Sequence, residues 1–345
     1  MAGQEIYSNR KAMDQAKQAI KRSDIIFSTC IGAGIGLLRT QDFDFVIVDE
    51  ASQQTEPASL VPLVKGCCKA VLVGDHVQLR PTVGQSALAL EFDVSLFERL
   101  FTRANRGQVV GEDETERLML DVQYRMHPSI CTFSSDEFYD GKLKTGIALD
   151  ARPIDGSMFP FPKGTKGVDF ERALFIQCSS REMPGQKSKE NKGQAEICLQ
   201  VCKLLTAASN DHGIIINSSP TTKSTPEQSI AILTPYTRQA DLLKRSLAEF
   251  GSRVEVSSID GFQGREADIV VFVTVRCNEH CETGFLKDLR RMNVALTRAR
   301  AALIVIGDRN TLTKGTSEGE GNSVVVWTKL VRWLKEVELP QENTS

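Results

Sequence analysis

The sequence lacks several features that would place it in a specialised class of protein. No apolar run approaches the length of a membrane span, and the first residues, MAGQEIYSNRKAMDQAKQAIKRSD, are polar rather than a secretory leader. An excess of charge is also missing, because 42 Lys and Arg stand against 44 Asp and Glu. These absences predict an intracellular protein of cytoplasm or nucleus without a membrane anchor. They exclude a generally basic nucleic-acid binder but not a local basic groove.

The nine cysteines do not indicate a disulfide framework, since the chain has 345 residues and no small-domain context. They are typical of reduced, mostly buried thiols. The segment CNEHC at residues 277–281 brings two cysteines and a histidine together, but no second ligand pair stands at a zinc-like spacing. We therefore do not expect a structural metal there.

Short apolar runs recur along the chain and predict strands. The run FVIV at residues 45–48 is rich in β-branched residues and lacks alternation, as in a strand covered on both faces of a parallel sheet. Helix-like stretches such as QADLLKRSLAEF lie between many of the runs. This alternation predicts an α/β fold with parallel sheets, and the length suggests two domains. The strand-like runs occupy residues 24–29, 44–49, 69–75, 117–122, 173–178, 229–234, 254–259, 268–275 and 302–308.

Two polar stretches interrupt this pattern. The first, ANRGQVVGEDETER at residues 104–117, is predicted to connect two lobes. The second, NDHGIIINSSPTTKSTPEQ at residues 210–228, is predicted to be a long, partly mobile surface insertion.

Two adjacent acids, Asp49 and Glu50, directly follow the run FVIV at residues 45–48. In parallel sheets the ligand crevice lies outside the carboxyl ends of the strands, which is where this pair falls. One interpretation is an ordinary acidic helix start. The other is a magnesium-holding aspartate followed by a glutamate that orients or deprotonates the attacking water in nucleotide hydrolysis. The dipeptide alone does not decide between them.

Polar groups follow other predicted elements in the same way. Together they supply the acids, glutamine and arginines that hold magnesium, position water and neutralise charge on a γ-phosphate. Most of them follow strands, and three are predicted to lie along one side of a helix. The strand-end residues are Asp75, Gln78, Gln123, Tyr124, Arg125, Gln263, Arg265 and Glu266, and the helix residues are Arg291, Val294 and Arg298.

Six segments make the pattern specific: VIVDEASQQTEP, VGDHVQLRP, QYRMHP, TPYTRQ, SIDGFQGREADIVVFVTVR and RRMNVALTRAR. In this order they are highly similar to the motifs of superfamily 1 helicases, in the branch containing the nonsense-mediated-decay helicase and senataxin. The resemblance implies two RecA-like lobes of the P-loop NTPase fold, with ATP between them and single-stranded RNA or DNA across their top. It also implies an RNA-processing or RNA-decay complex as partner. The C-terminal part of an incomplete first lobe would occupy residues 1–112 and the second lobe 113–345, with a mobile insertion at about 208–228.

For the first lobe, the resemblance implies three roles around ATP and Mg²⁺. Asp49 is similar to the magnesium ligand, Glu50 to the acid that activates water, and Gln78 to the γ-phosphate sensor.

For the second lobe, the resemblance implies four further nucleotide contacts. Tyr124 would stack on adenine and Glu266 would bond the ribose hydroxyls, while Arg125 and Arg298 would reach the γ-phosphate. Arginines supplied in this way stabilise the transition state only when the lobes close.

For the nucleic acid, the resemblance implies that five residues lie near the path of the strand. Hydroxyls and backbone amides there would contact phosphate without reading sequence, and Tyr236 could support stacking. The ordinary alternative for each is a satisfied turn hydroxyl or a packed ring. The five residues are Thr29, Arg80, Thr234, Tyr236 and Ser258.

One family motif is missing: nowhere does the sequence contain G-x-x-x-x-G-K-[ST], the loop that cradles phosphates. The glycine cluster STCIGAGIG at residues 28–36 does not replace it, because its glycines stand at the wrong offsets for a dinucleotide site. We expect that the chain begins partway through the first lobe. Three interpretations stay open: a fragment or shortened product of an ATP-driven helicase, a pseudo-ATPase that binds nucleic acid or protein, or a site completed by another polypeptide.

Overall fold

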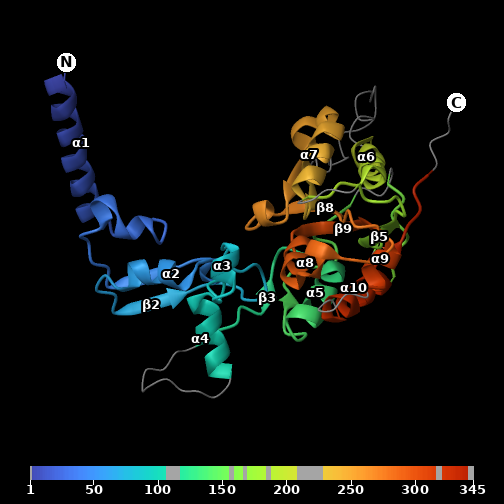
Figure 1. Cartoon of the computed structure of the whole chain (residues 1–345), viewed down its shortest axis with the longest axis horizontal. Helices are drawn as coiled ribbons and strands as arrows, with labels where there is room; N and C mark the ends of the chain where they lie inside the picture. Colours follow the sequence, from blue (N-terminus) through green and yellow to red (C-terminus); the bar gives the residue numbers. More distant parts are fainter. Residues whose placement is uncertain are drawn as a thin grey trace, which may run out of the picture. The chain divides into compact units, whose positions relative to one another are not determined.

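The computed structural model divides into two compact units, Met1–Arg117 and Leu118–Ser345 (Figure 1). It describes residues 2–105, 117–154, 159–165, 169–183, 188–207, 228–315 and 321–340. Most of the predicted connection at 104–117 lies outside these ranges, as does nearly all of the predicted insertion at 208–228. The predicted lobe boundary after residue 112 also falls outside them and stays a prediction.

The first unit is built on two parallel strands, β1 (Phe45–Val48) and β2 (Lys69–Leu72). Val46 and Val48 of β1 point into a small core, while Phe45 and Ile47 are 53% and 61% exposed. The prediction that this strand is covered on both faces is therefore wrong for the described residues, because only one face is packed. The first unit also contains the helices α1 (Ala2–Arg22), α2 (Glu56–Leu63), α3 (Gln85–Leu88) and α4 (Leu96–Asn105).

Two predicted strands differ in the structure. Among the described residues, the run DIIFST at residues 24–29 pairs with no strand and is not a strand itself, and Phe27 within it is 93% exposed. The run at 117–122 gives only the short β3 (Val122–Gln123), which pairs with β4 (Lys144–Thr145). Both runs were predicted to be strands because of their apolar residues alone. A strand forms only where a neighbouring backbone completes its hydrogen bonds.

The second unit contains a six-stranded parallel sheet in the order β10-β5-β9-β8-β6-β7. The strands β5, β6, β8 and β9 are almost entirely buried, which explains their unbroken apolar sequences. The predicted α/β fold with a parallel sheet is confirmed. The strands are β5 (Ala173–Gln177), β6 (Ile230–Thr234), β7 (Val254–Ser258), β8 (Ala267–Val273), β9 (Ala299–Gly307) and β10 (Lys335–Glu336).

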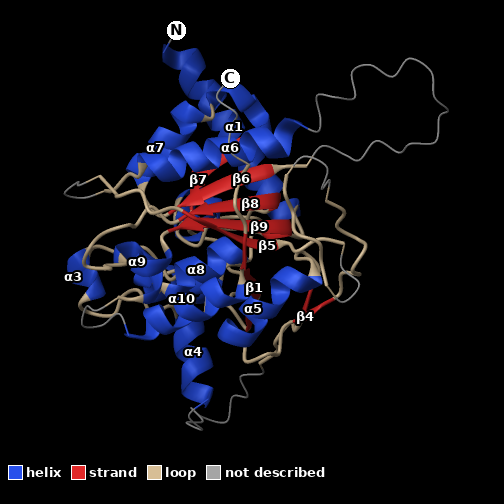
Figure 2. Ribbon diagram, turned by 90° about the vertical axis from the view of Figure 1, so that its right-hand side faces the viewer, coloured by secondary structure: helices blue, strands red, loops and turns tan. Residues whose placement is uncertain are grey.

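Helices cover both faces of this sheet. Figure 2 shows α6 (Lys192–Ala207) and α7 (Thr237–Ser246) on one face, and α5 (Pro128–Phe138), α8 (Leu289–Leu296) and α10 (Gly321–Trp333) on the other, with α9 (Arg309–Thr313) beside them. One face packs Ile232, Val271 and Ile304 against the buried cysteines of α6. On the other, Trp327 lies 6.1 Å from Phe272 between ring centroids. None of the helices in the described ranges combines the length and apolar character of a membrane span.

Candidate functional site

The acid pair of the first unit stands at a sharp turn after β1. Glu50 adopts a left-handed conformation, with φ 50° and ψ 39°, which is uncommon for a residue other than glycine. The Asp49 carboxylate accepts a hydrogen bond from the Glu50 amide at 3.0 Å, and the Glu50 carboxylate accepts one from the Gln53 side chain at 2.7 Å. Both acids are exposed and neither starts α2, which begins at Glu56. The turn therefore presents two carboxylates at the end of the strand.

The end of β2 lies beside this turn, because Val48 and Leu72 are partners in the parallel register. A β-carbon on Gly74 would come 2.8 Å from the Ser52 amide, so only glycine fits there. The buried Ser52 hydroxyl accepts a hydrogen bond from the Asp75 amide at 3.2 Å, which ties the two strand ends together.

Gln78, the predicted γ-phosphate sensor, is oriented by Asp75. Its side-chain amide donates to the Asp75 carboxylate at 2.6 Å, and that carboxylate also accepts from the Val77 amide at 3.2 Å. Sequence reasoning placed Asp75 at this edge without assigning it a role. In the structure it is a positioning residue for Gln78.

The donors at this edge fit Mg²⁺ in its usual mode. Magnesium takes oxygen ligands and commonly uses one or two carboxylates beside substrate phosphates and water. Asp49 offers an exposed carboxylate, of which one oxygen accepts the Glu50 amide. Within the described ranges, no group of three or more histidine, cysteine or acidic side chains is placed to hold a metal ion.

In the second unit, three of the four predicted nucleotide residues, Arg125, Glu266 and Arg298, are connected through hydrogen bonds that include Thr297. The Arg125 guanidinium donates to the Glu266 carboxylate at 2.7 Å and to the Thr297 carbonyl at 3.2 Å. Arg298 is buried, and it donates to the Val294 carbonyl and to the Thr297 hydroxyl, both at 3.1 Å. Arg125 and Glu266, which are 141 residues apart in the sequence, thus lie next to the turn that carries Thr297 and Arg298.

Arg298 does not lie on a helix, contrary to the prediction. The helix α8 ends at Leu296, and the strand β9 begins at Ala299. The Thr297 hydroxyl donates back to the Asn293 carbonyl at 2.8 Å, which closes the helix before Arg298. Arg298 therefore occupies the turn between helix and strand.

Tyr124 presents its ring to solvent, with 68% of the residue exposed. The ring lies against the backbone of Gly146, where an added β-carbon would come 2.3 Å from the ring carbon Cε1. The Gln123 side chain accepts from the amides of Arg125 and Met126 at 2.8 and 2.7 Å and so fixes the turn. An exposed flat ring on a fixed turn is suited to stacking.

Two supports of this turn carried no signal in the sequence. Arg152 donates to the Tyr124 carbonyl at 3.1 Å, and Gly146 provides the bare backbone beneath the ring. Neither belongs to a recognisable motif, because their role depends on a chain segment that returns to the turn from 20 residues or more away. Gln123 was visible as part of QYRMHP, but its function as a backbone clamp was not.

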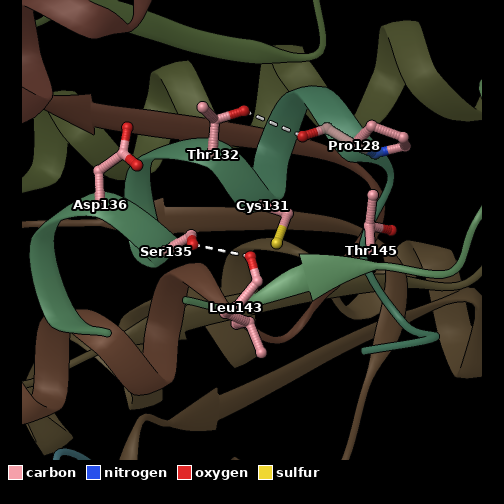
Figure 3. Close-up of a pocket in the computed structure, with 7 residues that line it drawn as sticks. All are labelled: Pro128, Cys131, Thr132, Ser135, Asp136, Leu143 and Thr145. Carbon is pink, nitrogen blue, oxygen red and sulfur yellow. Dashed lines mark hydrogen bonds between the residues drawn. The ribbon is translucent and has the colours of Figure 1, made fainter. Parts of the chain in front are cut away.

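A hollow of about 180 Å³ lies next to this region, between α5 and β4 (Figure 3). Its hydroxyls are engaged by backbone carbonyls, Thr132 with Pro128 at 3.1 Å and Ser135 with Leu143 at 2.7 Å. Burial raises the pKa of the Cys131 thiol, so the thiol is not activated. None of the predicted site residues lines the hollow, and we do not assign it a role.

Three residues predicted to lie near the nucleic acid have defined partners. Arg80 donates to Asp93 at 2.9 Å and to Glu98 at 2.7 Å, so its charge is neutralised within the first unit. The exposed Thr29 accepts from the Gly32 amide at 3.0 Å. Ser258 accepts from the Gly261 amide at 3.1 Å. The hydroxyls keep donor capacity for a phosphate.

The other two residues of this set are buried. Thr234 is fully covered, and within the described ranges its hydroxyl has no hydrogen-bond partner. Tyr236 is 3% exposed, its hydroxyl accepts from Arg276 at 3.3 Å, and its ring packs against Phe285. A base cannot reach the Tyr236 ring in this arrangement, because the neighbouring loop covers it.

The comparison with known families decides the classification. Two models described as AAA domain match the chain, one over residues 2–86 and the other over residues 92–310. The chain belongs to this family, the AAA domains of superfamily 1 helicases. The predicted family membership and the predicted α/β class are thereby confirmed.

Curated relatives agree with the family match. The chain is 36% identical over 323 residues to the Regulator of nonsense transcripts 1 homolog of Arabidopsis thaliana, covering 89% of this chain and 23% of the relative. It is 34% identical to the ATP-dependent helicase NAM7 of Saccharomyces cerevisiae, covering 87% and 29%. It is 35% identical to the DNA polymerase alpha-associated DNA helicase A of Schizosaccharomyces pombe, covering 85% and 41%. The chain thus spans less than half the length of each of these three relatives.

Proposed function

We propose that the chain is helicase machinery that couples ATP hydrolysis to movement along single-stranded RNA or DNA. The observation that supports this most is that Arg125 binds both Glu266 and the carbonyl of Thr297, the residue that precedes Arg298. Each of these residues matches a helicase motif that carries a nucleotide contact by resemblance. Their partners also fix the side chains in place, which is how a protein prepares charge for a phosphate before the phosphate arrives.

Hydrolysis would divide its tasks between the two sets of residues. Glu50 takes the proton of the attacking water, and Gln78 senses the γ-phosphate from its place on Asp75. Arg125 and Arg298 neutralise the charge that develops on the phosphate, while Tyr124 and Glu266 hold adenine and ribose. Asp49 would hold magnesium, which would supply further charge neutralisation.

Binding of nucleic acid would rest on phosphate contacts by exposed hydroxyls such as Thr29 and Ser258 and by nearby amides. Such contacts do not distinguish bases, so we propose little sequence preference. RNA-processing or RNA-decay complexes are the proposed setting, in the cytoplasm or nucleus, because the relatives include regulators of nonsense transcripts.

A second candidate function is favoured by one observation, the lack of G-x-x-x-x-G-K-[ST] in the 345 residues. Without that loop the chain as it stands would be a non-catalytic module that binds nucleic acid or protein. We propose accordingly that these 345 residues alone do not turn over ATP.

Titration of labelled single-stranded oligonucleotides of several sequences, at two salt concentrations, tests the proposal. We expect binding that is similar for all sequences and falls steeply with salt, because phosphate contacts release counterions. Binding that ignores salt, or no binding, would contradict the proposal and favour a protein-interaction role.

A further inference from the structure

An exposed aromatic ring lies on the segment that follows β8. Phe285 belongs to the short 3-10 helix η7 (Gly284–Lys287) and is 49% exposed. On its inner side the ring packs against Tyr236, with 5.3 Å between the ring centroids, and the Arg291 guanidinium lies 5.8 Å from its centroid. The rest of the ring faces solvent.

The backbone that carries Phe285 is fixed by its neighbours. The Phe285 amide donates to the Tyr236 hydroxyl at 3.4 Å, and the carbonyl of the buried Leu286 accepts from the Trp327 indole at 2.9 Å. Gly284 has a positive φ of 58°, and a β-carbon there would come 2.1 Å from the Arg276 guanidinium. A ring on so constrained a backbone loses little conformational freedom when it binds.

Tyr236 belongs to a buried polar network beneath this ring. Its hydroxyl accepts from Arg276 at 3.3 Å, and Arg276 in turn donates to the Glu182 carboxylate at 2.8 Å. Glu182 also accepts from the Cys277 amide at 3.0 Å. Because these groups hold one another, Tyr236 acts as a support for Phe285 rather than as a surface contact.

The ring also stands beside residues already proposed to contact nucleic acid. In the parallel sheet β8 pairs with β6, and β6 pairs with β7. The segments after these strands therefore share one edge, which brings Phe285 to the edge that carries Ser258. Arg291 links the two segments, since it donates to Asp260 at 3.0 Å while its guanidinium contacts the Phe285 ring. The exposed Lys287 adds a positive charge next to the ring.

We propose that Phe285 is the residue of the second unit on which a base of single-stranded nucleic acid stacks, with Tyr236 as its positioning residue. The inference rests on the proposed binding of single-stranded nucleic acid. Stacking on an aromatic ring tolerates every base, because every base has a π-face. The sequence pointed to Tyr236 for this task, and the structure assigns the exposed ring of Phe285, 49 residues further along the chain.

The test is a titration of the full chain with a short oligonucleotide that contains 2-aminopurine, a base whose fluorescence is quenched when it stacks. Phe285→Ala should weaken binding roughly 5- to 150-fold and reduce the quenching, as loss of one base–aromatic stack predicts. Phe285→Tyr should bind like the original chain, and Phe285→Leu should behave like the alanine variant because it keeps bulk but has no π-face. Val325→Ala, at a residue that is 52% exposed on α10, is the matched control and should change nothing.

Unchanged affinity and quenching in both Phe285→Ala and Phe285→Leu would overturn this inference and leave the proposed function standing. No binding by the original chain would overturn the proposed function itself, and this inference with it. Thermal melting followed by tryptophan fluorescence checks that each variant is folded, since Trp327 and Trp333 both belong to the second unit. If the alanine variant melts early, the comparison of Phe285→Leu with Phe285→Tyr decides the question.

Discussion

Arg125 and Glu266 are 141 residues apart in the sequence, and in the structure the Arg125 Nε lies 2.7 Å from a Glu266 carboxylate oxygen. The pair is partly exposed, so by itself it contributes little to stability. The pair instead orients the Arg125 guanidinium, which also donates to the Thr297 carbonyl at 3.2 Å. A nucleotide would meet an arginine and an acid that are already placed against each other.

The first prediction concerns this pair. Glu266→Gln keeps the shape of the side chain but removes its negative charge. The Glu266 carboxylate accepts a hydrogen bond from Arg125 and, as proposed, one from a ribose hydroxyl. We expect the weak affinity for fluorescent ADP to fall about tenfold, the equivalent of ~1.4 kcal/mol for one charge-assisted hydrogen bond. Glu255→Gln is the matched control, since Glu255 pairs with Arg265 on the same unit outside this cluster. An equal loss in both variants would argue against a nucleotide role for Glu266.

The second prediction concerns pH. His127 is fully buried at the start of α5, where its Nε2 lies 2.9 Å from the Leu149 carbonyl and its Nδ1 accepts from the Ser129 amide at 3.2 Å. Burial, opposed by the bond to Leu149 and reinforced by the charge of Arg172, lowers the pKa of His127. As the pH falls below the ordinary histidine pKa of about 6.5, His127 becomes protonated in the unfolded chain while it stays neutral in the folded chain.

Stability of the second unit should therefore be unaffected by this residue above pH 7 and should decline below about pH 6.5, by at most ~1.4 kcal/mol per pH unit. Urea unfolding followed by tryptophan fluorescence measures it. His127→Gln should be less stable at pH 7.5 but should show a smaller decline on acidification. An equal decline in both proteins would assign the effect to another group.

The third prediction concerns Arg80, whose side chain is 30% exposed while those of Asp93 and Glu98 are 14% and 11% exposed. Arg80→Gln leaves two poorly solvated carboxylates without their cation and should destabilise the first unit by about 1–3 kcal/mol. Arg99→Gln breaks the pair with Glu56, in which both side chains are 31% exposed, and should cost about 1 kcal/mol or less. Hydrogen exchange in α4 reports both changes, and equal acceleration in the two variants would refute the ranking.

The fourth prediction compares the two units. The paired strands β1 and β2 of the first unit are largely exposed on at least one face, whereas the strands β5, β6, β8 and β9 of the second unit are almost entirely buried. Two paired strands are marginal on their own, so amides in residues 25–75 should exchange faster than those in 254–308. The second unit should also fold when it is produced alone. Slower exchange in 25–75 would contradict this prediction.

Local sequence was sufficient for those elements whose burial is complete. Ile232, Val271 and Ile304 lie in unbroken apolar runs, and such runs are stable only inside a parallel sheet with helices on both faces. The acids after β1 could also be placed, because the position of a residue after a parallel strand fixes its edge of the sheet.

What the sequence did not reveal depends on contacts between distant segments. Tyr236 was predicted to be available for stacking, yet the loop around Phe285 covers it. Arg80 resembled a nucleic-acid contact, but Glu98 from α4 neutralises it. Phe27 lies in an apolar run that pairs with no strand in the part of the chain that the structure describes. In each case the outcome depends on which other element arrives next to the residue, and no local pattern records that.

The most direct test of the account is phosphate release by the purified chain, with and without single-stranded RNA. We predict no ATP turnover above background from the 345 residues. Removal of even one well-placed electrostatic donor commonly lowers the rate about a hundred- to a thousandfold. Here the whole phosphate loop is missing from the sequence. Fusion to the segment of a family member that contains this loop should produce RNA-stimulated turnover that Glu50→Gln and Arg298→Ala abolish. Robust turnover by the chain alone, lost in Glu50→Gln, would contradict the account and would show that another segment replaces the loop.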